Sequence, residues 1–292
     1  MRYLCSFLFA LFIAVPAQAE PPGVVADIAP VHALVAQVMA GVGTPDLILR
    51  PGSTPHGYAL RPSGARALQA ADLVVWIGPG LTPWLTGPIA NLAPNAVRLE
   101  LLEAPGTITR PYRGAGDDGH GQTDPHAWLD PENGRIWLGL IAERLIALDP
   151  DNAGRYRANA AEGQAILERL AGEIEILLGP VKNRPYVTYH DAYQYFEARF
   201  GLAPVGAVSL GDASDPSPAR LVTLARKMRE NNVACAFSEP QFDDGLLRAA
   251  AAGEALKIAV LDPMGSALTP GASLYPDLLR AMARAMADCL AP

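Results

Sequence analysis

Three histidines of this 292-residue chain share one local context, a stiff loop or the end of a short apolar run. His56 lies in the loop PGSTPHGYALRPSG, whose prolines and glycines exclude a regular helix. His126 lies in DPHAWLDP, and His190 ends the apolar run PYVTYH. A stiff loop pre-orients the side chain that it carries, so we expect these three imidazoles to converge on one point.

Converging imidazoles indicate a metal site, because neutral imidazole nitrogens bind zinc, copper, iron and nickel well. Asp262 ends the apolar run in IAVLDPMG and is a carboxylate in a corresponding place. His56, His126, His190 and Asp262 therefore predict a tetrahedral site with three nitrogen ligands and one oxygen ligand, two from each half of the chain. The alternative for Asp262 is that it caps the turn at 263–265 and that water completes the coordination shell.

The two remaining histidines carry weaker signals. His32 lies near the start of a predicted helix, where we expect a structural or exposed side chain. His120 lies beside Asp117 and Asp118 in the polar, glycine-rich loop GAGDDGHGQT. We expect a solvated loop that supplies no ligand of the main site, because ordering such a loop costs entropy. Asp117, Asp118 and His120 could hold a cation there only weakly, as accessory contacts.

Short apolar runs alternate with helical patterns along the chain, which predicts βαβ units and parallel sheets, an α/β fold. The expected strands are at residues 24–28, 47–49, 73–77, 97–102, 185–189, 233–237 and 258–261. The expected helices are at residues 32–39, 65–71, 192–200, 219–230, 246–255 and 275–290. Ligands of parallel sheets gather at the carboxyl ends of strands, which is where His56 and His190 stand.

A long amphipathic run separates two sets of these elements. Apolar or small residues recur at spacings of three and four from Tyr156 to Leu177, which predicts a helix of roughly thirty residues, about 45 Å long. Such a helix is too long for one lobe. We therefore expect an N-terminal α/β lobe at residues 20–148, a linking spine helix at 149–179 and a C-terminal α/β lobe at 180–292, with the metal site in the cleft.

The first nineteen residues have the form of a cleaved secretory signal. Arg2 precedes an apolar run at residues 4–15, and Ala17-Gln18-Ala19 is a small-x-small cleavage site before Glu20. The alternative, a membrane anchor, needs an apolar run of about 20 residues. Cys5 lies inside the apolar run and not at the cleavage point, so we expect an exported protein of the periplasm without a lipid anchor.

Charge and cysteine content narrow the class of protein further. The formal net charge is −7, and an acidic surface argues against nucleic-acid partners and against electrostatic attachment to a membrane. Two cysteines remain after signal removal, Cys235 and Cys289. An even count in an oxidising compartment suggests one disulfide, worth about 4 kcal/mol as an upper figure, and two free buried thiols are the alternative.

Five motifs, in this order, resemble a known family: PGSTPHGYALRPS, DPHAWLDP, YHDAYQYF, SEPQF and LDPMG. Together they resemble the metal-binding proteins that feed ABC importers, the cluster A-I or cluster 9 solute-binding family, and within it the zinc-binding ZnuA type. The resemblance implies a monomeric binding protein, not an enzyme, that delivers Zn²⁺ to an inner-membrane permease and its ATPase. It also implies a disulfide between Cys235 and Cys289 and the ligands His56, His126, His190 and, in many members, Asp262.

Three departures from the family pattern bear on the metal. Pro55 stands where some members have a glutamate, and the His-rich loop of many members is reduced to GAGDDGHGQT. His190 replaces the carboxylate of manganese-binding relatives, which favours zinc. The alternatives are a Mn²⁺ or Fe²⁺ binding protein of the same importer class, a surface adhesin, and a zinc hydrolase with Glu239 as its base.

Overall fold

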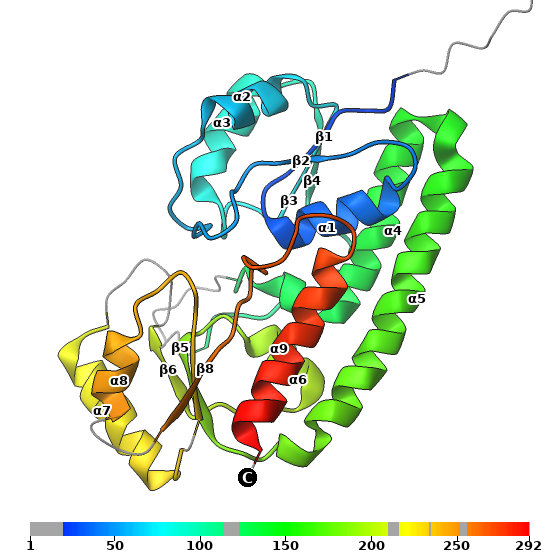
Figure 1. Cartoon of the computed structure of the whole chain (residues 1–292). Helices are drawn as coiled ribbons and strands as arrows, with labels where there is room; N and C mark the ends of the chain where they lie inside the picture. The colour runs from blue at the N-terminus through cyan, green and yellow to red at the C-terminus, as the bar shows by residue number, and fades with distance from the viewer. Residues whose placement is uncertain (1–19, 114–122, 210–215, 234, 252–255, 292) are drawn as a thin grey trace, which may run out of the picture.

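Two parallel four-stranded sheets lie one above the other beside a layer of long helices (Figure 1). The computed structural model describes residues 20–113, 123–209, 216–233, 235–251 and 256–291. The expected signal segment at 1–19 and the loop residues Asp117, Asp118 and His120 lie outside the described residues. No helix among the described residues combines the length and apolar character of a membrane span.

The first sheet has the strand order β2-β1-β3-β4, with every pair parallel. Helix α1 (Ala29–Val38) covers one face, and the other face packs against α2, the 3₁₀ helix η1 (Pro83–Leu85) and α3. Val24 and Val25 point into different cores, as expected of a strand that is buried on both faces. The bounds are β1 Val24–Ala26, β2 Asp46–Leu47, α2 Pro62–Gln69, β3 Leu73–Trp76, α3 Thr86–Leu92 and β4 Val97–Glu100.

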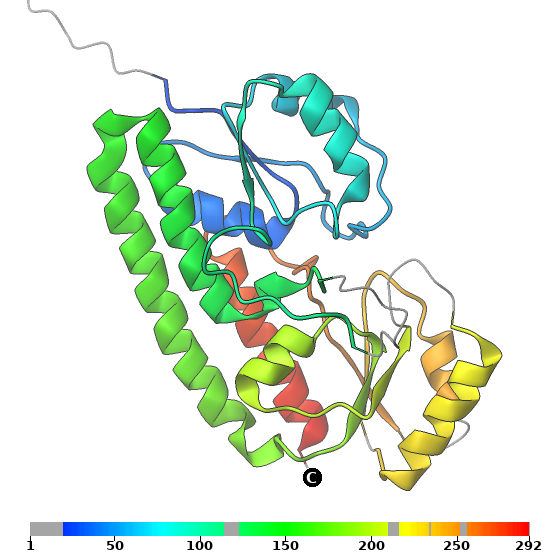
Figure 2. The same ribbon diagram turned by 180° about the vertical axis from the view of Figure 1, so that it is seen from behind.

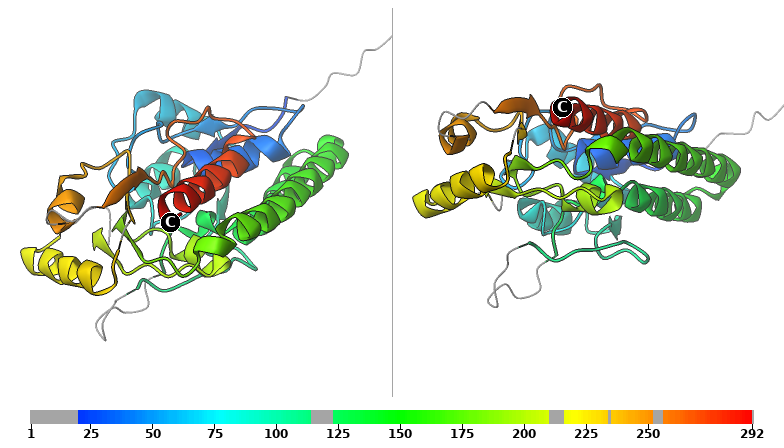
Figure 3. Two further views of the ribbon diagram at one scale, coloured as in Figure 1. Left: turned by 60° about the horizontal axis from the view of Figure 1, so that its bottom comes forward. Right: turned by 90° about the horizontal axis from the view of Figure 1, so that it is seen from below.

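The second sheet has the order β6-β5-β7-β8 and is again parallel throughout. Helices α7 and α8 cover one face, and α6 and α9 cover the other (Figure 3). His190 is the last residue of β5, and it pairs with Ser209 of β6. The bounds are β5 Tyr186–His190, α6 Gln194–Phe200, β6 Gly206–Ser209, α7 Pro218–Glu230, β7 Cys235–Ser238, α8 Gly245–Ala251, β8 Lys257–Val260 and α9 Leu274–Leu290.

The predicted spine helix is α5 (Ala153–Leu178), which runs past both sheets (Figure 2). It is not alone. Residues 131–148, for which the sequence pattern above predicts no element, form α4 (Pro131–Leu148), an antiparallel neighbour of α5. The sequence does contain a helix-start signal, Asp130 followed by Pro131. In the structure Asp130 caps α4 by accepting a hydrogen bond from the Glu132 N–H at 2.9 Å.

Helices α1 and α9 pack against α5 and against each other, so one continuous core crosses from the first sheet to the second. Gly163 of α5 lies at a close approach, because a Cβ there would be 2.9 Å from both Leu138 of α4 and Gln37. This explains a glycine inside the long helix. The lobe boundaries at 148/149 and 179/180 stay a prediction.

The disulfide between Cys235 and Cys289 is present and joins the start of β7 to the last turn of α9. The Cα atoms of the two cysteines are 6.0 Å apart. The bond lies at the amino end of β7, whereas His190 stands at the carboxyl end of the neighbouring strand β5. It therefore stabilises the end of the second sheet that is remote from the histidines.

Candidate metal centre

The three histidines of the loops and strand ends do converge. One ring nitrogen from each of His56, His126 and His190 lies within 4.8 Å of those of the other two. No other set of His, Cys, Asp or Glu side chains in the described part of the chain comes together in this way. Tetrahedral zinc with bonds of 2.0–2.1 Å holds its nitrogens about 3.4 Å apart, so a shift on the order of 1 Å would close the group around the ion.

His126 is oriented by a buried carboxylate that the sequence motifs did not single out. Its Nδ1 lies 2.6 Å from Asp124 Oδ1, and its backbone N–H donates to the same oxygen at 2.9 Å. Burial acts to raise the pKa of Asp124, but the interactions with His126 outweigh it and the pKa lies below its ordinary value. An ionised Asp124 accepts the Nδ1–H, which leaves Nε2 of His126 as the nitrogen that could bind a metal.

His190 faces a second buried carboxylate. Its Nδ1 lies 3.5 Å from Glu239 Oε1, and both side chains are almost fully buried. The two residues also line a small cavity together with Thr54 and Gln241. Glu239 stands in the motif SEPQF, but its position behind the ring follows from the packing of β7 beside β5.

His56 is held by an indole that sequence reasoning also missed. The Trp84 Nε1–H donates to the Pro55 carbonyl at 2.7 Å, one residue before His56. The ring of Tyr58, two residues after His56, packs on Trp84 with centroids 5.2 Å apart. The loop is therefore fixed by η1 as well as by its prolines.

The DPHAWLDP segment is tied to the second half of the chain, although the predicted boundaries place it in the first. The Trp128 Nε1–H donates to the Pro263 carbonyl at 2.8 Å, and the Tyr275 hydroxyl donates to the Trp128 carbonyl at 2.6 Å. The Gln194 amide of α6 donates to Asp124. His126 and His190 are therefore both held by the second half of the chain, and His56 is held by the first half.

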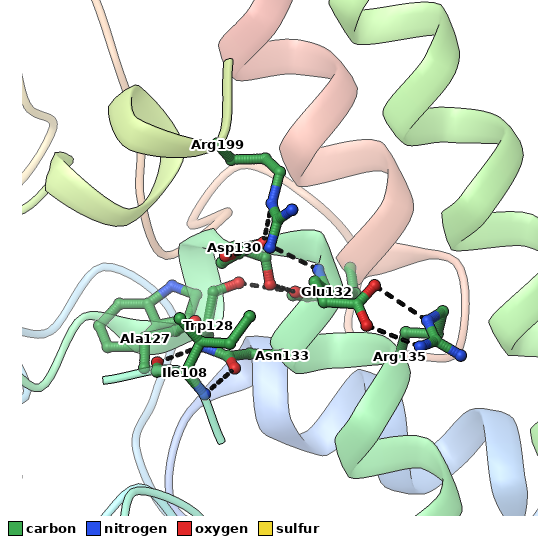
Figure 4. A network of polar contacts seen from close by, with 9 residues as sticks. Ile108, Ala127, Trp128, Asp130, Glu132, Asn133, Arg135 and Arg199 are labelled. Carbon is green, nitrogen blue, oxygen red and sulfur yellow. Dashed lines mark hydrogen bonds and ion pairs between the residues drawn. The ribbon is translucent and has the colours of Figure 1, made fainter. Parts of the chain in front are cut away.

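A charged pair completes this attachment. The Arg199 guanidinium of α6 donates to both oxygens of Asp130, at 2.7 and 2.8 Å, at the start of α4 (Figure 4). Asp130 is 1% exposed. The neighbouring Arg135–Glu132 pair in the same view is a surface contact three residues apart on one helix.

Asp262, predicted as the fourth ligand, is not one of the three converging groups. Its Oδ1 accepts from the backbone N–H groups of Met264 and Gly265, each at 3.0 Å. Its Oδ2 accepts from the Ser266 N–H at 2.6 Å and from the Ser266 hydroxyl at 2.7 Å. With these bonds Asp262 caps the turn, which was the alternative to its role as a ligand. Its role as a ligand stays a prediction.

His32 is buried away from this centre, and its Nε2 lies 3.1 Å from the Pro45 carbonyl oxygen. Burial lowers the pKa of His32, which favours the neutral ring. The expectation of a structural histidine at this position fits these contacts.

Comparison with known proteins decides the family. The family described as ZnuA, the periplasmic component A of a zinc-uptake complex, matches residues 24–289. The chain belongs to the ZnuA family. The high-affinity zinc uptake system protein ZnuA of Paracoccus denitrificans is 45% identical, with 95% of this chain and 94% of that protein covered. The protein of the same name from Brucella abortus is 34% identical, with 99% and 97% covered.

The fold agrees with this membership. A solved structure described as the crystal structure of ZnuA matches with a TM-score of 0.81 and 25% identity, covering 93% of this chain and all of the other. The ZnuA family consists of components of a zinc-uptake system, so the chain is a transport component and not an enzyme. The zinc hydrolase alternative is thereby wrong.

Proposed function

We propose that this chain captures one Zn²⁺ ion in the periplasm between His56, His126 and His190 and delivers it to an inner-membrane ABC permease and its ATPase. The convergence of three imidazoles within 4.8 Å carries this proposal. Membership in the ZnuA family and the names of its relatives in Paracoccus and Brucella support zinc as the cargo.

The donor set favours zinc over manganese. Three imidazole nitrogens, from the buried His126 and His190 and the partly buried His56, suit zinc, whereas Mn²⁺ prefers oxygen ligands and a higher coordination number. The fourth ligand is Asp262 or water. The four hydrogen bonds that Asp262 already accepts support water, because a move onto the metal would break the turn that they cap.

The distribution of the ligands suggests how the ion leaves. His126 and His190 are anchored to the second half, and His56 is anchored to the first through Trp84. A small separation of the halves would remove one ligand and keep two. We propose that docking on the permease uses this separation to release zinc.

The remaining parts of the proposal concern the chain itself. We propose that residues 1–19 are removed before Glu20 and that the mature chain is a monomer without a lipid anchor. The apolar run and the cleavage pattern support removal, and the place of Cys5 supports the absence of a lipid.

Replacement of each proposed ligand tests the site. His56→Ala, His126→Ala and His190→Ala should each weaken zinc binding by more than about 100-fold, since even outer-shell partners contribute 10–100-fold. The measurement is a competition titration against a chelator, with native mass spectrometry of the mature protein to count bound zinc. His120→Ala in the loop at 114–123 is the control, and it should leave the high-affinity step of zinc binding unchanged.

Three variants that bind zinc as tightly as the wild type would contradict the site. Manganese that displaces zinc at comparable concentration would contradict the preference and would favour the Mn²⁺ or Fe²⁺ alternative.

A further inference from the structure

The turn after β7 packs directly on His190. Glu239 follows β7, and the Phe242 N–H donates to the Glu239 carbonyl at 3.2 Å, which closes the turn. The Phe242 ring meets His190 edge to face, with centroids 6.2 Å apart, and stacks on Tyr189 at 4.9 Å. The turn is thus fixed against the strand that carries His190.

The Glu239 carboxylate is buried in this turn without a full set of partners. The residue is 5% exposed, and Oε1 lies 3.5 Å from His190 Nδ1, beyond hydrogen-bond distance. Among the described residues, this oxygen has no hydrogen-bond partner. A buried carboxylate oxygen left in this way costs free energy, which a hydrogen bond from a nearby donor would recover.

Asp124 shows what the completed arrangement looks like in this protein. Its oxygen lies 2.6 Å from Nδ1 of His126, and its position is fixed further by the His126 backbone N–H and by Gln194. Glu239 and His190 repeat the same atom types, a buried carboxylate oxygen facing Nδ1, at a separation that is longer by about an ångström.

We propose that Glu239 is the positioning residue for His190: it accepts the Nδ1–H of that ring and so presents Nε2 to the metal. The proposal rests on the proposed function. A cation on Nε2 polarises the ring and strengthens its Nδ1–H as a donor to a carboxylate, so metal binding should shorten the contact to a hydrogen bond.

Two buried carboxylates then stand behind two of the three ligands. Asp124 and Glu239 place two buried carboxylates close to the three imidazoles, where carboxylates would offset the charge of a divalent cation. The β7–α8 turn becomes coupled to metal occupancy through Glu239.

The first test compares two substitutions of Glu239. Glu239→Gln keeps an acceptor but removes the charge, and should weaken zinc binding about 10-fold. Glu239→Leu removes the acceptor as well and should weaken it about 100-fold. Asp244→Asn is the matched control, because it changes an acid in the neighbouring segment whose carboxylate pairs with exposed Arg248, and it should leave affinity unchanged. Affinities come from chelator competition on the mature protein.

The second test reads the ring itself. Long-range ¹⁵N–¹H spectra of histidine-labelled, zinc-loaded protein should show His190 protonated at Nδ1 and metal-bound at Nε2. Glu239→Gln should preserve this pattern, and Glu239→Leu should shift the Nδ1 resonance, which a merely structural defect elsewhere would not do. If Glu239→Leu fails to fold, the wild-type spectrum still shows which nitrogen of His190 binds zinc, and the affinity of Glu239→Gln still tests the role of Glu239.

Wild-type affinity in both Glu239 variants, or zinc bound through Nδ1 of His190 in the wild type, would overturn the proposal. A wild-type protein that binds no zinc would overturn the proposed function together with it, so the two failures are distinguishable.

Discussion

At the scale of single residues, the type of each proposed ligand is visible in the sequence, but the orientation of its side chain is not. Residue type and the surrounding loops identify His56, His126 and His190 as candidates. Which nitrogen the His126 ring offers depends on the carboxylate of Asp124, whose Oδ1 lies 2.6 Å from Nδ1. The spacing of two residues between Asp124 and His126 in DPHAWLDP was available as a signal, because a short loop lets a side chain reach its neighbour.

Asp124→Asn tests this orientation. The asparagine keeps an oxygen that can accept the Nδ1–H but loses the charge, so zinc affinity should fall about 10-fold. Chelator competition measures the change. Asp72→Asn is a suitable control, because Asp72 also accepts a backbone hydrogen bond, from Gly23 at 2.8 Å, but at the surface. An Asp124→Asn protein with unchanged zinc affinity would show that the charge of Asp124 does not strengthen metal binding by His126.

At the scale of elements, the alternation of apolar runs with helical patterns predicts most strands and the long helix. Strands β1, β3 and β4 and helix α5 lie within the predicted ranges, because buried parallel strands have a strong apolar signal. Helix α4 was not predicted, although its sequence carries the signals of a helix. Asp130 stands at its start as a cap, and buried apolar residues recur at helical spacing in Trp137, Leu138, Ile141 and Leu145. The roles of Trp84 and Glu239 depend on contacts between distant segments, which periodicity cannot show.

Trp84→Phe tests the support of the His56 loop. Phenylalanine keeps an aromatic ring against Tyr58 but loses the N–H that donates to Pro55. The loop must then be ordered when metal binds, so affinity should fall severalfold with little change in folding stability. Trp76→Phe is the matched control, since the Trp76 Nε1 has no partner among the described residues. Equal affinities in the two variants would argue against a supporting role for Trp84.

At the scale of the whole molecule, the two sheets are joined by more than one helix. Helices α1, α4, α5 and α9 form a shared core, and the DPHAWLDP segment is clamped by α6 and by the loop at Pro263. The prediction of one linking helix therefore captures the length of α5 but not the number of contacts that hold the halves. A protein built in this way should change shape by small shifts and not by free swinging of its lobes.

Arg199→Lys tests the clamp between α6 and α4. Lysine keeps the charge but cannot reproduce the two parallel bonds to Asp130, whose carboxylate is buried. The free energy of unfolding should fall by about 1–3 kcal/mol. Arg135→Lys removes the similar but exposed pair with Glu132 and should change it by less than about 0.5 kcal/mol. Urea denaturation of both variants measures the difference, and equal losses would mean that the Arg199 pair is an ordinary surface contact.

The disulfide allows stability and binding to be separated. Cys235→Ala with Cys289→Ala removes the bond between β7 and α9 and should lower the free energy of unfolding by about 2–4 kcal/mol. Zinc affinity should stay unchanged, because the bond lies at the amino end of β7 and His190 stands at the carboxyl end of the neighbouring strand β5. Chemical denaturation and chelator competition on the same preparations measure both quantities, and wild-type protein treated with a reductant should match the variant. A variant that lost zinc affinity as well would show that the amino and carboxyl ends of the second sheet are mechanically coupled, and release of zinc would then depend on the redox state of the compartment.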